Sequence, residues 1–205
     1  MTTATSGMRR IRRTAIAGAA VAAAGAIALT GCSSSHDGHS AGGSSSVAAA
    51  SSTHDDADAT FVQTMIPHHE QAVEMADMLL AKSGVDARVV SLAREIKDAQ
   101  APEIATMRGW ASSWGVSATE HASMDHGSMS GTMSVDDMNR LRSAQGVEAA
   151  RLFLDQMIVH HTGAIAMAQN EIRDGSDPAA TQLARSIVTT QQREIATMRQ
   201  LLSEL

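Results

Sequence analysis

Residues 65–69 read Met-Ile-Pro-His-His, and the pattern returns at residues 157–161 as Met-Ile-Val-His-His. A second segment is also used twice: residues 103–108 read Glu-Ile-Ala-Thr-Met-Arg, and residues 194–199 repeat them letter for letter. The two segments occur in the same order in each half of the chain. An internal repeat of this kind indicates that one structural unit is built twice.

Around the first His-His pair, apolar residues recur at the spacing of an α-helix. At about 100° of rotation per residue, one side of the helix carries Phe61, Met65, His68, His69, Ala72, Met75, Ala76 and Leu79. Pro67 lies inside this pattern and would remove one backbone hydrogen bond. Because the second copy has Val159 at the matching place, we expect the helix to continue through Pro67 and to end near Gly84.

Three more helices follow from the same kind of pattern. The second should run from about Asp86 to Ser113, the third from about Val135 or Ala144 to Arg173, and the fourth from about Pro178 to Leu205. Two similar helical hairpins joined by a longer loop predict an all-α fold, a four-helix bundle over residues 55–205. The joining loop, residues 115–134, is rich in Met and His.

The first 54 residues have a different composition. Residues 1–32 combine a basic start with an apolar, Ala-rich run that ends in Leu-Thr-Gly-Cys, which predicts a lipoprotein signal peptide with Cys32 as the lipidated residue. An ordinary secretory signal with a chance Cys is the alternative. Residues 33–54 predict a flexible Ser/Ala/Gly tether. We therefore expect an exported protein, lipid-anchored to the outer face of the bacterial cell membrane.

The apolar sides of the four predicted helices, which should face the interior, form stripes that carry residue types able to bind metals. A charged residue on a buried stripe is costly unless it is paired or coordinates a cation, and each copy places one Glu there beside two His and several Met. Thioethers beside imidazoles favour copper, especially Cu(I), over iron, while zinc held by His alone is less favoured. The candidate ligands are His68, His69, His160, His161, Met65, Met75, Met107, Met157, Met167, Met198, Glu103 and Glu194, with Met124, His126 and Met129 in the loop.

A purely structural interpretation stays open beside the metal one. Glu103 and Glu194 could hold the histidines by hydrogen bonds, and the same carboxylates could also orient metal-bound His. The net charge of −6 argues against a nucleic-acid partner.

The His-His motif, followed by Ala72, Met75-Ala76, Gln100, Glu103-Ile104, Met107 and Trp110, resembles the bacterial domain-of-unknown-function family number 305. The resemblance covers both repeats and implies a ferritin-like helical bundle in the cell envelope that binds copper or silver. His68, His69, His160, His161, Met65, Met75, Met157 and Met167 match the family's motif. The second copy departs from the first at Thr162-Gly163, where the first has Glu70-Gln71, so the two half-sites are expected to differ in affinity.

Three functions remain open at this stage. The favoured one is an extracytoplasmic copper-binding protein, not an enzyme, that sequesters, buffers or transfers copper. A ferritin-like metal oxidase or oxidoreductase is the alternative, because the two Glu lie on inward stripes. The third is a structural interaction bundle without metal. The expected partners are a metal ion and, through the lipid anchor, the membrane, while a homodimer or a metallochaperone partner stays open.

Overall fold

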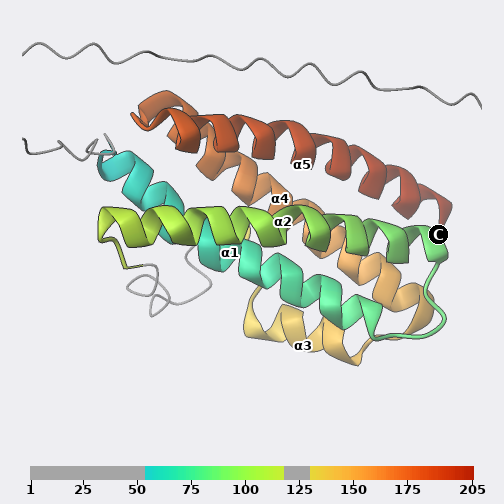
Figure 1. The fold of residues 1–205 in the computed structure, drawn as a ribbon. Helices are drawn as coiled ribbons and strands as arrows, with labels where there is room; N and C mark the ends of the chain where they lie inside the picture. Colours follow the sequence, from blue (N-terminus) through green and yellow to red (C-terminus); the bar gives the residue numbers. More distant parts are fainter. Residues whose placement is uncertain (1–53, 118–129) are drawn as a thin grey trace, which may run out of the picture. The chain divides into compact units, whose positions relative to one another are not determined.

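The computed structural model of the chain describes residues 54–117 and 130–205. Within these ranges the chain forms five α-helices and no β-strand (Figure 1). Four helices are long and one is short: α1 Asp56–Leu80, α2 Ala87–Trp114, α3 Val135–Ser143, α4 Gly146–Asp174 and α5 Pro178–Glu204. The predicted all-α fold with two helical hairpins is confirmed, since α1 and α2 form one hairpin and α4 and α5 form the other.

The ends of the helices have local causes. The Asp55 side chain accepts hydrogen bonds from backbone N–H groups of the first turn of α1, while the Asp58 carboxylate accepts the N–H of Asp55, which makes a reciprocal capping box. Asp177 caps α5 by accepting two backbone N–H groups. α2 ends at Gly115, whose φ of +70° favours glycine. As predicted, α1 continues through Pro67.

The third predicted helix is two helices in the structure. α3 ends at Ser143, and the backbone is extended at Ala144 and Gln145 before α4 begins. Gly146 starts α4 with a φ of +54° and lies against Gly84 in the α1–α2 turn. The chain uses both of the predicted starting points because the backbone turns between them.

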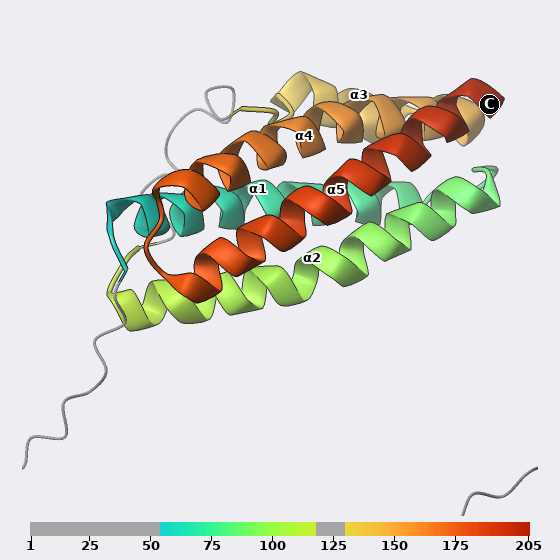
Figure 2. The ribbon, with the colours of Figure 1, turned by 90° about the horizontal axis from the view of Figure 1, so that it is seen from above.

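Each long helix runs antiparallel to its neighbours (Figures 1 and 2). α1 packs against α2 and α4, and α5 packs against α4 and α2. α2 ends at the opposite end of the bundle from the start of α4, so the connection between them runs back along the bundle. α3 is the last part of this connection and packs against α1 and α4.

The apolar interior consists of two cores. The α3 core joins α3 to the second half of α1, the first halves of α2 and α4, and the end of α5; it includes Met75, Leu79, Leu92, Leu141, Phe153, Met157 and Met198. The tryptophan core joins the first half of α1 to the second halves of α2 and α4 and the start of α5; it includes Phe61, Met65, Met107, Ala164 and Ile187, with Trp110 and Trp114 at its edge. The internal repeat relates the two cores, since Phe61 of one corresponds to Phe153 of the other.

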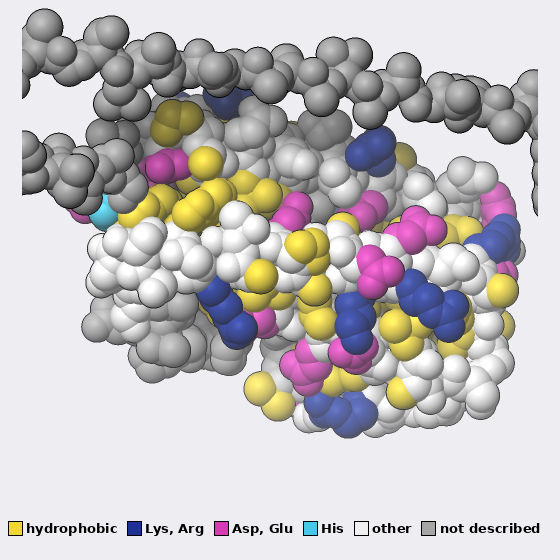
Figure 3. Space-filling view, in the orientation of Figure 1, with side chains coloured by type: hydrophobic (Ala, Val, Ile, Leu, Met, Phe, Trp, Pro, Cys, Tyr) yellow, Lys and Arg dark blue, Asp and Glu magenta, His cyan; other side chains and the backbone are white. Residues whose placement is uncertain are grey.

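The surface carries charges of both signs. In Figure 3, acidic and basic side chains are interspersed over the face formed by α2, α1 and α3, and histidine colour shows only at one edge, near the start of α1. Among the described residues, no helix combines the length and the apolarity that crossing a bilayer requires.

Candidate metal centre

The four histidines of the repeat lie between the two cores. His68 and His69 on α1 follow the tryptophan-core residues of that helix and precede its α3-core residues, and His160 and His161 hold the matching place on α4. All four side chains are fully buried. The ring centroids of His68 and His160 are 3.7 Å apart, and those of His160 and His161 are 6.4 Å apart. We call these four residues the histidine layer.

Each hairpin holds one histidine of the layer by a carboxylate. His69 Nε2 lies 2.9 Å from Glu103 Oε2, and His161 Nε2 lies 2.7 Å from Glu194 Oε2. A carboxylate can only accept, so Nε2 carries the proton in both imidazoles and Nδ1 keeps its lone pair. Both Nδ1 atoms are buried without a protein partner. The Glu side chains themselves are 18% and 13% exposed, so they reach the edge of the interior.

The other two histidines differ from each other. His68 Nε2 donates to the backbone carbonyl of Ser130 at 3.2 Å, which again leaves Nδ1 as the lone-pair nitrogen. His160 makes no hydrogen bond of normal geometry at either ring nitrogen. Buried polar groups are rarely left without partners. The histidine layer is therefore unusual, because each of its four rings has at least one nitrogen without a hydrogen-bond partner.

Burial keeps the inner imidazoles neutral. Loss of solvent, followed by repulsion from His69, lowers the pKa of His68 to about 3. Loss of solvent and then repulsion from His68 hold the pKa of His160 well below its usual value. Neutral imidazole is the form that binds a metal ion, so both rings are ready to act as ligands at neutral pH.

The structure divides the predicted methionine ligands between the two cores. Met65 and Met107 are buried in the tryptophan core, and Met75, Met157 and Met198 are buried in the α3 core. Met167, the counterpart of Met75, is half-buried beside the tryptophan core. The interior therefore offers thioethers on both sides of the histidine layer, and not one cluster of all candidate ligands.

The arrangement suits some metals better than others. In residues 54–117 and 130–205, no three His, Cys, Asp or Glu side chains converge on one metal position. A tetrahedral zinc site of the structural type is therefore not formed in the described part of the chain. The buried Nδ1 atoms of His68, His69 and His161 have no protein partner, and methionines lie in the cores on either side of the histidine layer.

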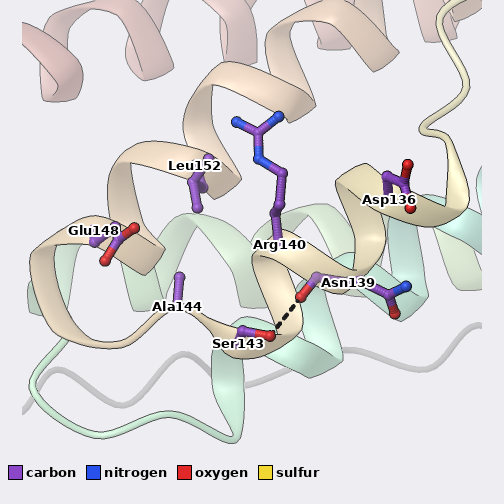
Figure 4. A pocket seen from close by; sticks show the side chains of 7 residues that line it. All are labelled: Asp136, Asn139, Arg140, Ser143, Ala144, Glu148 and Leu152. Atoms are coloured by element: carbon purple, nitrogen blue, oxygen red, sulfur yellow. Dashed lines mark hydrogen bonds between the residues drawn. The ribbon is translucent and has the colours of Figure 1, made fainter.

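Some predicted residues lie outside the described ranges. The loop residues Met124, His126 and Met129 and the lipidation residue Cys32 are among them. The described part of the chain has several pockets at its surface. One of about 640 Å³, between α3 and the start of α4, is lined by Asp136, Arg140, Glu148 and Leu152 among others (Figure 4) and contains none of the candidate ligands.

Three buried or histidine-bound polar groups were not among the predicted site residues. The Ser130 carbonyl, which holds His68, carries no sequence signal because it is a backbone atom. Gln100 and Gln191, at matching places in the repeat, are both 2% exposed and have side-chain oxygens without a partner. Their positions on the apolar stripes, three residues before each Glu, would have pointed to them.

Comparisons with known proteins show which family the chain belongs to. The family model "Domain of unknown function (DUF305)" matches residues 58–202. No functionally curated protein shows significant similarity to the chain.

Several solved structures are similar to this chain in both sequence and fold. A DUF305 fragment from Deinococcus radiodurans is 35% identical, with a TM-score of 0.68 over 74% of this chain and 98% of its own. A DUF305 protein from Streptomyces coelicolor, classed as secreted, is 32% identical, with a TM-score of 0.67 over 72% and 93%. CopM in its Cu(I)-bound form is 32% identical, with a TM-score of 0.60 over 72% and 96%. CopM has also been solved with Cu(II) and with silver. This chain belongs to the DUF305 family.

Proposed function

We propose that the chain is an exported copper-binding protein that takes up Cu(I) at the histidine layer for sequestration, buffering or transfer. The observation that carries the proposal is the set of buried Nδ1 atoms of His68, His69 and His161, each left unpartnered because Nε2 is already engaged. The likeness to CopM, solved with Cu(I), Cu(II) and silver, supports the choice of a soft metal.

A binding role accounts for the site better than catalysis does. The four imidazoles are fully buried, which suits retention of an ion, whereas a metal enzyme needs an open coordination position and a path for substrate. Export is supported by the relative from Streptomyces coelicolor that is classed as secreted. The lipid anchor at Cys32 and a homodimeric or metallochaperone partner remain part of the proposal.

The test is a titration of the full chain with Cu(I) in competition with a chromophoric chelator. A His68→Ala/His160→Ala variant should lose the tight site, while a Met124→Ala/His126→Ala/Met129→Ala variant should retain it. Circular dichroism of each variant checks that the helices are intact. Equal affinity of the unaltered chain and the His68/His160 variant would contradict the proposal, and so would tight binding that disappears only in the loop variant.

A further inference from the structure

The groove between α1 and α4 is crossed by a short stretch of backbone that covers the histidine layer. Residues 130–133, which we call the strap, are held by hydrogen bonds at Ser130 and at Met133. The Ser130 carbonyl accepts the Nε2–H of His68 at 3.2 Å. The side chain of Gln71 donates to the Met133 carbonyl at 3.0 Å and accepts the Met133 N–H at 2.7 Å. The strap is thus fixed both to the histidine ring and to the helix that bears it.

Glycines allow the strap to lie close to α4. A Cβ atom on Gly131 would stand 2.8 Å from the Val159 carbonyl oxygen, and one on Gly163 would stand 2.6 Å from the carbonyl carbon of Ser130. Gly131 also has a φ of +85°, which favours glycine. The matching positions in the two copies of the repeat thus have different roles. Gln71 on α1 binds the strap, and its counterpart on α4, Gly163, leaves space for it.

The strap lines two surface hollows, one between α1 and α4 and the other between α1 and α3. One groove, of about 430 Å³, ends at Ser130 and is lined by Phe61, Thr64 and Met167 among others. The other, of about 380 Å³, lies beyond Met133. The first groove is lined both by Ser130, whose carbonyl accepts the Nε2–H of His68, and by Met167, which carries a thioether.

We propose that the strap is the gate of the histidine layer, and that a soft metal ion enters from the Met167 groove when the strap lifts from Gly163. This inference rests on the proposed function. Lifting the strap frees His68 Nε2 and exposes the neighbouring rings of His68 and His160, and its return closes the bound ion away from water. The gate is independent of the carboxylates, which hold the opposite side of the layer.

Two variants loosen the strap by different means. Gly163→Ala places a methyl group where Ser130 packs, and the helix itself favours Ala over Gly, so the bundle should remain folded. Gln71→Ala removes both hydrogen bonds to Met133. The matched controls are Gly109→Ala, where a Cβ atom meets nothing within 4 Å, and Gln169→Ala on the exposed face of α4.

The first readout uses no metal. Diethyl pyrocarbonate modifies accessible imidazoles, and mass spectrometry assigns the modified residue. The loss of two hydrogen bonds of ordinary net strength corresponds to an increase on the order of tenfold in local opening. We expect His68 and His160 of the apo protein to react about that much faster in both strap variants and at an unchanged rate in both controls. Unchanged reactivity in the strap variants would overturn the gate.

The second readout is the rate at which the apo protein takes up Ag(I), followed by stopped-flow competition with a chelator. Uptake should be faster in Gly163→Ala and Gln71→Ala than in the controls. Uptake that is accelerated by Glu103→Ala and not by the strap variants would overturn the gate in favour of entry between α2 and α5. Failure of every variant and of the unaltered chain to bind metal would instead overturn the proposed function, so the two failures are distinguishable.

Discussion

Glu103 and Glu194 each hold one imidazole of the histidine layer, and the two pairs have nearly the same geometry, with Nε2–Oε2 distances of 2.9 and 2.7 Å. The structure thus contains the polar pairing that the sequence left open beside metal binding. The two interpretations are compatible, since a carboxylate that fixes the Nε2–H tautomer leaves Nδ1 for a metal ion.

Removing one of these carboxylates should destabilise the apo protein. Glu103→Ala leaves the Nε2–H of His69 buried without an acceptor, which costs about 1–3 kcal/mol of unfolding free energy. Glu103→Gln retains an acceptor oxygen and should cost less. Urea unfolding of both variants checks this, with the exposed Glu95→Ala as the control. Equal stability of Glu103→Ala and Glu95→Ala would show that the Glu103–His69 pair contributes nothing.

The lowered pKa of His68 makes a prediction about acid stability. The folded protein keeps His68 neutral down to about pH 3, whereas His68 of the unfolded chain takes up a proton near the ordinary histidine pKa of 6.5. The unfolded state therefore binds more protons between these values, and the free energy of unfolding should fall as pH falls through this window. Urea midpoints of the apo chain at pH 7, 5.5 and 4.5 measure the slope. His68→Gln should make it shallower, and an identical slope would contradict the assignment.

At the scale of helices, one buried pair breaks the symmetry of the repeat. Leu79 near the end of α1 lies in the α3 core, but its counterpart on α4 is Glu171, which is 2% exposed. Glu171 faces Asp58 at the start of α1. Asp58 is also buried and accepts hydrogen bonds from Ser176 and Asp177 in the α4–α5 turn. The first turn of α1 is thereby fixed to that turn by a pair of carboxyl groups.

The pair shares one proton. Burial, together with the hydrogen bond to Asp58 and its charge, raises the pKa of Glu171 to about 8. Burial alone would raise the pKa of Asp58, but hydrogen bonds from the backbone of Asp55 and Asp177 and from Glu171 outweigh it and hold the value at about 2. At neutral pH Glu171 is therefore largely the neutral acid, and Asp58 carries the negative charge.

This pair should weaken the protein in alkali. Between the ordinary glutamate pKa of 4.5 and the folded-state pKa of Glu171, about 8, the folded state binds the extra proton. The free energy of unfolding therefore falls as pH rises through that window. Glu171→Gln has nearly the same shape and cannot titrate, so it should flatten the decline. Urea unfolding at pH 5, 7 and 9 checks this. A decline of the same size in the variant would assign it to other groups.

The elements also show what the sequence could and could not predict. The long helices and the burial of both His-His pairs follow from the periodic apolar pattern, and the structure confirms the helices, including the passage of α1 through Pro67. The break before Gly146 and the path of the strap could not be predicted, because both depend on which helices the connection packs against. One sequence feature pointed to the strap: Gly163 is a small residue at the position that corresponds to Gln71 in the other copy of the repeat.

At the scale of the whole molecule, the histidine layer joins the two hairpins. His68 belongs to the first hairpin and His160 to the second, and their rings are in contact at the α1–α4 interface. A metal ion bound between them would connect both halves of the duplication at the centre of the bundle. Global unfolding must separate these residues, so an ion bound between them would stabilise the fold as a whole and not one helix.

Metal binding should therefore raise the melting temperature by mass action. Free ligand at a hundred times its dissociation constant adds about 2.7 kcal/mol to the free energy of unfolding. At about 2–4 °C per kcal/mol for a domain of this size, the shift is on the order of 5–10 °C. Differential scanning fluorimetry with Ag(I), or with Cu(I) under reducing conditions, measures it. The His68→Ala/His160→Ala variant should show no shift, because its two hairpins lack the shared ligands. A shift of equal size in that variant would place the stabilising ion elsewhere, and a larger shift with Zn²⁺ than with Ag(I) would contradict the preference for a soft metal.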